Sequence, residues 1–273
     1  MLWSAVGILL VPLLLWAQPN DEEEDWMVFR WRSFVEAPSL GVSGGVAQLQ
    51  REGIGLRFQG PAVTLRLGSA ELRTLRSASL ERYEHSYGFL ALTPSLHRAD
   101  TLRMRWWRFG VGRQEGYGYR LGNGGALLLL SGGGLHWSQV TLAEGAQVDA
   151  LQPFGQQLRF GSVRDGMVLV QLTPLLGIGL GFERAVIFPA HLVWKYLGSS
   201  LIEFVGSELI VGGFVRRVLK ARMPQAAPVV NFLLRSGVAI GWTELLRTRM
   251  NWPFDSPPPA LLDQLQLSVQ MVF

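Results

Sequence analysis

Two side chains near the middle of the chain have the types and the spacing that acyl transfer requires. His136 and Ser138 are two residues apart, so in a β-strand both would lie on the same face. A histidine can act as the base that activates a serine hydroxyl, and a carboxylate such as Glu144 can orient the imidazole. The tripeptide from Glu84 to Ser86 suits this chemistry less, because adjacent strand residues point to opposite faces.

Other kinds of site find little support in the sequence. The four histidines are isolated and there is no cysteine, so we expect neither a metal centre nor thiolate catalysis. No glycine loop followed by lysine, of the kind that holds phosphate, is present. We therefore expect no cofactor. The formal charge of +4 is spread along the chain rather than clustered, which argues against nucleic acid as a partner.

The elements that would position these side chains are β-strands. After residue 26, apolar side chains recur at every second position, as in 54–58 and 63–67, which flank a Gly-Pro break and predict a hairpin. Segments 176–182 and 237–242 are also predicted strands, with large apolar residues on one face and almost only glycine on the other. In a membrane barrel the apolar face would contact lipid, and the glycine face would line the interior.

A segment near 189–223 has a different pattern and predicts a helical insert. Its polar residues recur at every fourth position: Lys195, Ser199, Glu203 and Ser207. Such spacing places them along one side of a helix. Glu203 and Glu208 argue against a lipid-exposed spanning helix. A plug inside the barrel, a helix at the membrane surface and, over 209–215, another strand remain open; we favour a helix that fills or caps the barrel.

Several arginines on the predicted strands could face the interior of such a barrel. The candidates are Arg57, Arg66, Arg103 and Arg105. A ring of inward arginines would attract anions, as charged rings do in pores. The alternative, which we prefer for a barrel of this size, is that they pair with carboxylates of an internal network, for which Glu203 and Glu208 are available.

The N-terminus predicts export from the cytoplasm. Residues 1–17, MLWSAVGILLVPLLLWA, are apolar and uncharged and end in a small residue, which is typical of a secretory signal peptide; an uncleaved anchor is the alternative. An acidic linker would follow over 18–25, and residues 26–273 would form the barrel domain.

The last nine residues carry the most informative pattern. Leu265, Leu267, Val269, Met271 and Phe273 alternate with Gln266, Ser268, Gln270 and Val272. This alternation resembles the terminal strand of bacterial outer-membrane β-barrel proteins, which ends in an aromatic residue. The resemblance implies that the barrel-assembly machinery recognises this strand and that it closes the barrel against the first strand.

The sequence therefore predicts an all-β membrane protein of the outer membrane of a diderm bacterium, in contact with outer-membrane lipid. Its fold would be an antiparallel transmembrane β-barrel of about 8–12 strands with a helical insert. We expect a non-enzymatic structural, assembly or small-solute role. The spacing of His136 and Ser138 resembles the His-x-Ser pair of outer-membrane lipid A deacylases, so a lipid-modifying acyl hydrolase is one alternative; a soluble secreted β-protein that binds an apolar ligand is another. A structural role for His136 and Ser138 is favoured, because a His-x-Ser tripeptide arises often by chance.

Overall fold

A computed structural model describes residues 29–30, 37–52, 54–75, 80–98, 102–122, 124–142, 149–155, 157–190, 192–205, 211–220 and 224–273. The expected signal peptide and acidic linker lie outside these residues, as do Glu144 and Glu208.

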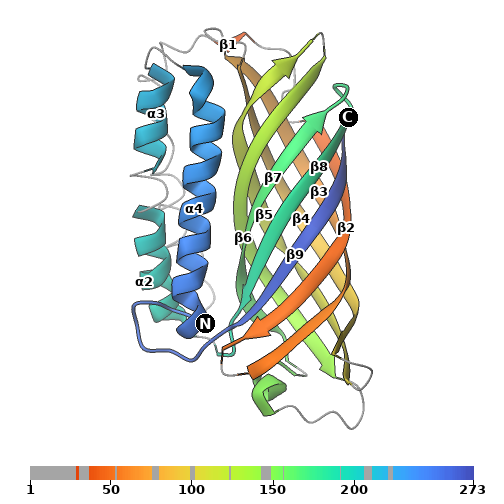
Figure 1. Ribbon diagram of the computed structural model, residues 1–273, viewed down its shortest axis with the longest axis vertical. Coiled ribbons are helices and arrows are strands. Elements are labelled where there is room, and N and C mark those ends of the chain that lie inside the picture. Colours follow the sequence, from red (N-terminus) through yellow and green to blue (C-terminus); the bar gives the residue numbers. More distant parts are fainter. Residues whose placement is uncertain are drawn as a thin grey trace, which may run out of the picture.

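Eight strands form a closed antiparallel barrel (Figure 1). They are β2 (Ala37–Arg51), β3 (Ile54–Leu75), β4 (Leu80–Arg98), β5 (Leu102–Leu121), β6 (Gly125–Leu142), β7 (Arg159–Gln171), β8 (Leu176–Ile187) and β9 (Ala260–Val272). A short β1 (Phe29–Arg30) adds to the end of β3. Each strand of the barrel pairs with its neighbour in the chain, and β9 pairs with both β8 and β2, which closes the sheet. The predicted barrel fold and the predicted pairing of the first and last barrel strands are confirmed.

The alternation of side chains sets which face of each strand points inward. On β9, Gln264, Gln266, Ser268 and Gln270 are buried, whereas the leucine, valine and methionine residues between them are exposed. On β8, the glycines 177, 179 and 181 point inward and the large residues between them point outward. The prediction that a glycine face lines the interior is therefore correct for 176–182.

The two ends of the barrel differ in the length of their connections. At one end, here called the turn end, the strands are joined through 76–79, 122–124 and 172–175. Gly122 in one of these turns has φ of 60°, a conformation that glycine adopts without strain. At the opposite end, here called the loop end, two connections are long: 143–158 and 188–259.

The longer connection forms helices on the outside of the barrel. They are α2 (Val193–Phe204), α3 (Gly212–Lys220) and α4 (Ala227–Thr248), with a short η5 (Pro224–Ala226) before α4. We call residues 192–248 the helical hairpin. Helices α2 and α3 run from the loop end to the turn end, and α4 returns (Figure 1). Helix α4 contacts β5, β6 and β7.

The helical insert is confirmed, but two details of its prediction are wrong. The hairpin lies beside the barrel, not inside it (Figure 1). Residues 237–242 lie within α4 and not in a strand. Their alternation covers only six residues, while Gly237 and Gly241, four residues apart, equally fit one face of a helix. Of the alternative strand over 209–215, residues 212–215 belong to α3.

Candidate functional site

The centre of the barrel holds a compact group of charged side chains from four strands. Glu183 on β8 accepts hydrogen bonds from Arg66 of β3 at 2.9 Å and from Arg108 of β5 at 2.5 Å. Asp165 on β7 lies 3.7 Å from the same Nη2 atom of Arg66. All four side chains are at most 5% exposed. Two cations and two carboxylates thus balance one another, as buried charges must.

Uncharged side chains complete this central layer. The Nε2 atom of Gln114 donates to Asp165 at 2.6 Å, and the hydroxyl of Tyr87 donates to it at 3.3 Å. The guanidinium of Arg66 lies 5.1 Å from the centroid of the Tyr87 ring, within the range of a cation–π contact. The amide oxygen of Gln264 accepts from Arg108 at 3.3 Å.

The inward glycines make room for these long side chains. A Cβ atom on Gly112 would lie 2.8 Å from the ring of Tyr87, and one on Gly179 would lie 2.8 Å from the sulfur of Met167. Both distances are too short for real contacts. The glycine faces therefore accommodate side chains from other strands of the barrel, whereas we had predicted that a helical insert would occupy that space.

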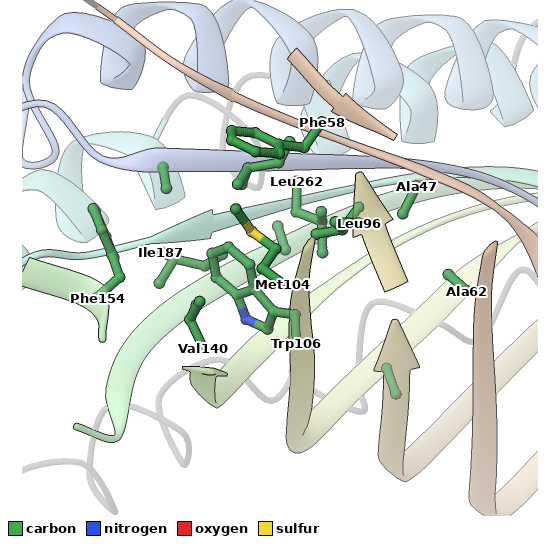
Figure 2. Packing of buried hydrophobic residues seen from close by; sticks show 14 of the residues in the cluster. Ala47, Phe58, Ala62, Leu96, Met104, Trp106, Val140, Phe154, Ile187 and Leu262 are labelled. Atoms are coloured by element: carbon green, nitrogen blue, oxygen red, sulfur yellow. The ribbon is translucent and has the colours of Figure 1, made fainter. Parts of the chain in front are cut away.

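An apolar cluster closes the barrel interior toward the loop end. Trp106 and Met104 of β5 pack there with side chains from other strands, including Phe58, Val140, Ile187 and Leu262 (Figure 2). A short 3-10 helix, η3 (Asp149–Phe154), contributes Leu151 and Phe154, which are 1% and 0% exposed. The segment that enters the mouth of the barrel is thus part of the β6–β7 connection.

A second apolar cluster lies on the other side of the charged layer. It includes Leu128 and Leu130 of β6, Met167 and Leu169 of β7, and Val272 of β9. Between the two apolar clusters there is a cavity of about 10 Å³, lined by residues that include Arg66 and His85. A space of that size holds about one water molecule. Within the described residues, this cavity is too small for a solute path or for an apolar ligand.

The pair His136 and Ser138 lies inside the barrel. Both side chains project inward from β6 and are 0% and 1% exposed. They share a face, but they make no hydrogen bond with each other. A lipid substrate has no access to a hydroxyl that is enclosed in this way, so the arrangement does not support acyl transfer at Ser138.

A different serine and histidine do meet in the interior. Ser39 Oγ lies 2.8 Å from His85 Nε2, and Gln270 Nε2 lies 3.3 Å from His85 Nδ1. Gln270 also donates to the hydroxyl of Tyr83 at 2.5 Å. Ser39 and His85 are 5% and 2% exposed, so we interpret the group as a buried hydrogen-bonding chain. Ser39 and His85 are 46 residues apart in the sequence, so no local sequence motif predicts their contact.

The predicted lumen residues are distributed over both faces of the barrel. Arg66 lies in the interior, as proposed, and Arg108, which was not predicted, lies beside it. Arg105 points outward and is exposed, so its assignment to the lumen is wrong: near the loop end, the apolar Met104 and Trp106 occupy the interior. The side chains of Arg57 and Arg103 lie outside the described parts of the chain.

Glu203 does pair with an arginine, but on the outside of the barrel. Its partner is the outward-facing Arg164 of β7, at 2.5 Å. Three further ion pairs attach the hairpin to the barrel. Arg235 of α4 contacts Glu115 of β5 at 2.6 Å, and Glu244 of α4 contacts Arg184 of β8 at 2.6 Å. Arg247 of α4 contacts Glu52, which follows β2, at 3.0 Å. Arg184 also pairs with Asp263 of β9 at 2.6 Å. Ionic contacts at three strands therefore hold the hairpin against the barrel.

Metal binding finds no support in this arrangement. Within the described ranges, no three histidine, aspartate or glutamate side chains come together as metal ligands would.

Comparisons with known proteins bear on the fold alone. The chain matches no family model and no curated protein sequence. Among solved structures it is similar to Neisserial surface protein A, with 9% identity, a TM-score of 0.39 and coverage of 86% of this chain and 97% of that one. It is also similar to Ail, the attachment invasion locus protein of Yersinia pestis, with 9% identity, a TM-score of 0.35 and coverage of 87% and 99%. These values are low, and the assignment of a closed barrel rests on the strand pairing itself.

Proposed function

We propose that this protein is an outer-membrane β-barrel protein with a non-enzymatic, structural role: a sealed barrel that holds the helical hairpin at a fixed place on its outer wall. The observation that carries the proposal is that polar side chains fill the inside of the barrel while apolar side chains cover its outside. Charged and amide side chains are enclosed, while the outward positions of β9, β2, β3 and β4 carry leucine and valine residues such as Leu267, Val46 and Leu67, which are 64%, 59% and 56% exposed. Only a lipid solvent favours that arrangement over so much of a surface.

A chain of aromatic side chains on the outer wall supports the same placement. Near the loop end, Trp107, Phe109, Trp137 and Phe160 contact one another in sequence, with ring centroids 5.6, 5.8 and 5.7 Å apart. Aromatic girdles of this kind lie at the boundary between hydrocarbon and water. Because short turns face the periplasm in outer-membrane barrels and long loops face outward, we assign the turn end to the periplasm and the loop end to the cell surface.

The structural role is favoured over transport by the filled interior. Apolar layers close both sides of a charge-balanced centre, and the alternation of β9 toward Phe273 makes the barrel-assembly machinery the expected partner during insertion. In this view the surface that meets other components is the outer wall with its hairpin.

Two measurements test the proposal. The folded protein should resist carbonate extraction from membranes and should migrate faster on a gel before heating than after, as a stable barrel does. Planar-bilayer recordings should show no current through the purified protein. Recovery in the soluble fraction would contradict the membrane placement, and a steady conductance would contradict the sealed barrel.

A further inference from the structure

The helical hairpin has features of a segment that lies in lipid. We infer that α2 and α4 are embedded in the same membrane as the barrel, with their outward face against the acyl chains. This inference rests on the proposed placement of the barrel in the outer membrane, and it adds a membrane-embedded helical element beside the strands.

Helix α4 has the dimensions of a membrane span. Its 22 residues make it about 33 Å long at 1.5 Å per residue, close to the roughly 30 Å of a hydrocarbon core. Residues 224–248 are long and apolar enough to cross a membrane, and only 17% of the most apolar window is buried against the rest of the chain. A core helix of a water-soluble protein would be mostly covered. The helix runs alongside the strands (Figure 1).

The side chains that the hairpin turns away from the barrel are large and apolar. Leu233 and Ile240 of α4 are 62% and 53% exposed, and Trp194 and Leu201 of α2 are 81% and 58% exposed. Leu265 on the barrel wall, at 58%, is exposed to the same degree. Large apolar side chains exposed to this degree are unfavourable in water, on the helices as on the barrel wall.

Three charges of the hairpin have partners on the barrel wall. Glu203, Arg235 and Glu244 pair with charged residues there. The side chains of Glu203 and Arg235 are 12% and 18% exposed, whereas that of Glu244, near the loop end of α4, is 45% exposed. Two glutamates in this segment argue against a spanning helix on composition alone. The ion pair of Glu203 removes that objection for this residue, because a paired charge facing protein is tolerated in a membrane.

Two exposed arginines of α3 lie toward the turn end, where lipid headgroups would meet the barrel in the proposed membrane placement. Arg216 and Arg217 are exposed near the end of α3. This helix packs against Leu75 and Leu80, which flank the β3–β4 turn, so both arginines lie toward the turn end. Arginine side chains at such a position can reach lipid phosphates while their stems remain among acyl chains.

Site-specific labelling tests this inference cleanly, because the chain contains no cysteine. A single cysteine is introduced by Leu233→Cys in the full chain, and a polarity-sensitive nitrobenzoxadiazole fluorophore is attached. The matched control is Leu265→Cys on the barrel wall, of nearly equal exposure, and the aqueous control is Gln157→Cys in the β6–β7 connection, which is also exposed. Each variant is placed in phosphatidylcholine–phosphatidylglycerol vesicles with spin-labelled acyl chains.

We expect quenching at position 233 to be within about twofold of that at 265 and several-fold above that at 157. Quenching at 233 as low as at 157, with rapid reaction of the unlabelled Leu233→Cys thiol toward an aqueous maleimide, would overturn the inference and place the hairpin in water. Low quenching at 233, together with protection of the unlabelled thiol from maleimide and disulfide-linked dimers of the unlabelled variant after mild oxidation, would also overturn it, because a second copy would then cover the face. Low quenching at 265 would instead contradict the membrane placement of the barrel itself.

Discussion

Replacing Glu183 by glutamine removes the acceptor that two buried arginines share. Arg66 and Arg108 donate to its two oxygens at 2.9 and 2.5 Å, and all three side chains are at most 5% exposed. The amide of Glu183→Gln could accept from one arginine, but its NH2 group would face the other, donor against donor. The variant would leave two guanidinium groups with only Asp165, 3.7 Å from Arg66, as a carboxylate partner.

The expected loss of stability follows from this burial. Breaking a buried ion pair by removing one partner costs about 3–5 kcal/mol, and about 3 kcal/mol already lowers the ratio of folded to unfolded protein by roughly a hundredfold. Glu84→Gln is the matched control, because Glu84 also pairs with two arginines, Arg82 at 2.6 Å and Arg113 at 2.5 Å, but on the outer surface near the turn end, where Arg113 is 58% exposed. Such an exposed pair contributes about 0–1 kcal/mol.

The assay is urea unfolding of each variant in lipid vesicles, followed by the gel shift between the folded and the heated protein. We expect a clearly lower urea midpoint for Glu183→Gln than for the unchanged protein. The midpoint of Glu84→Gln should be almost unchanged. A double variant, Arg108→Met with Glu183→Gln, should recover part of the loss, because Arg66 and Asp165 then remain as a balanced pair. Equal midpoints for Glu183→Gln and Glu84→Gln would refute the account of the interior network.

Three further outcomes follow from other parts of the fold. Gly110→Ala should destabilise the barrel by about 1–3 kcal/mol, because its Cβ would collide with the carbonyl oxygen of Leu135. The control is Gly44→Ala, whose Cβ meets nothing within 4 Å and which should leave the unfolding midpoint unchanged. Similar midpoints for the two variants would argue against the close approach at Gly110. In detergent solution, where the bilayer no longer shields the helices, Arg184→Met loses partners on both α4 and β9 and should make the segment 188–259 more sensitive to limited proteolysis while the gel shift of the barrel persists. An unchanged digestion pattern in detergent would show that these ion pairs do not hold the hairpin. Phe273→Ala should lower the fraction assembled in cells with little change in the unfolding midpoint, because the side chain is 64% exposed; assembly at the normal level would contradict its expected role as a signal.

The parts of the fold that could be predicted are those with a local period. The alternation on β9 and the glycine face of β8 each specify which side of a strand faces inward, because side chains alternate at every step. The same rule failed at 237–242, where six residues with glycines four apart fit a helix as well as a strand. Longer context decides between them: these six residues belong to a mostly apolar segment of 22 residues that forms one helix.

The contents of the barrel could not be predicted, because they depend on contacts between distant strands. Glu183 meets Arg108 across 75 residues, and Ser39 meets His85 across 46. Closure of the barrel, not any motif, brings these groups together. For His136 and Ser138, the spacing correctly predicts that both side chains lie on one face of the strand. That face points into the closed barrel, and the spacing alone does not show whether a substrate can reach it.

The segment that contains the helical hairpin is inserted at one point of the sheet, between two strands that pair with each other. Ile187, the last residue of β8, pairs directly with Ala260, the first residue of β9. The whole segment 188–259 therefore leaves and re-enters the sheet at one adjacent strand pair, and a short turn could join the two strands without altering any register. The barrel is thus a frame that could accept, lose or exchange its helical segment as a module, and a shortened chain that still closes would allow the hairpin's contribution to be measured by subtraction.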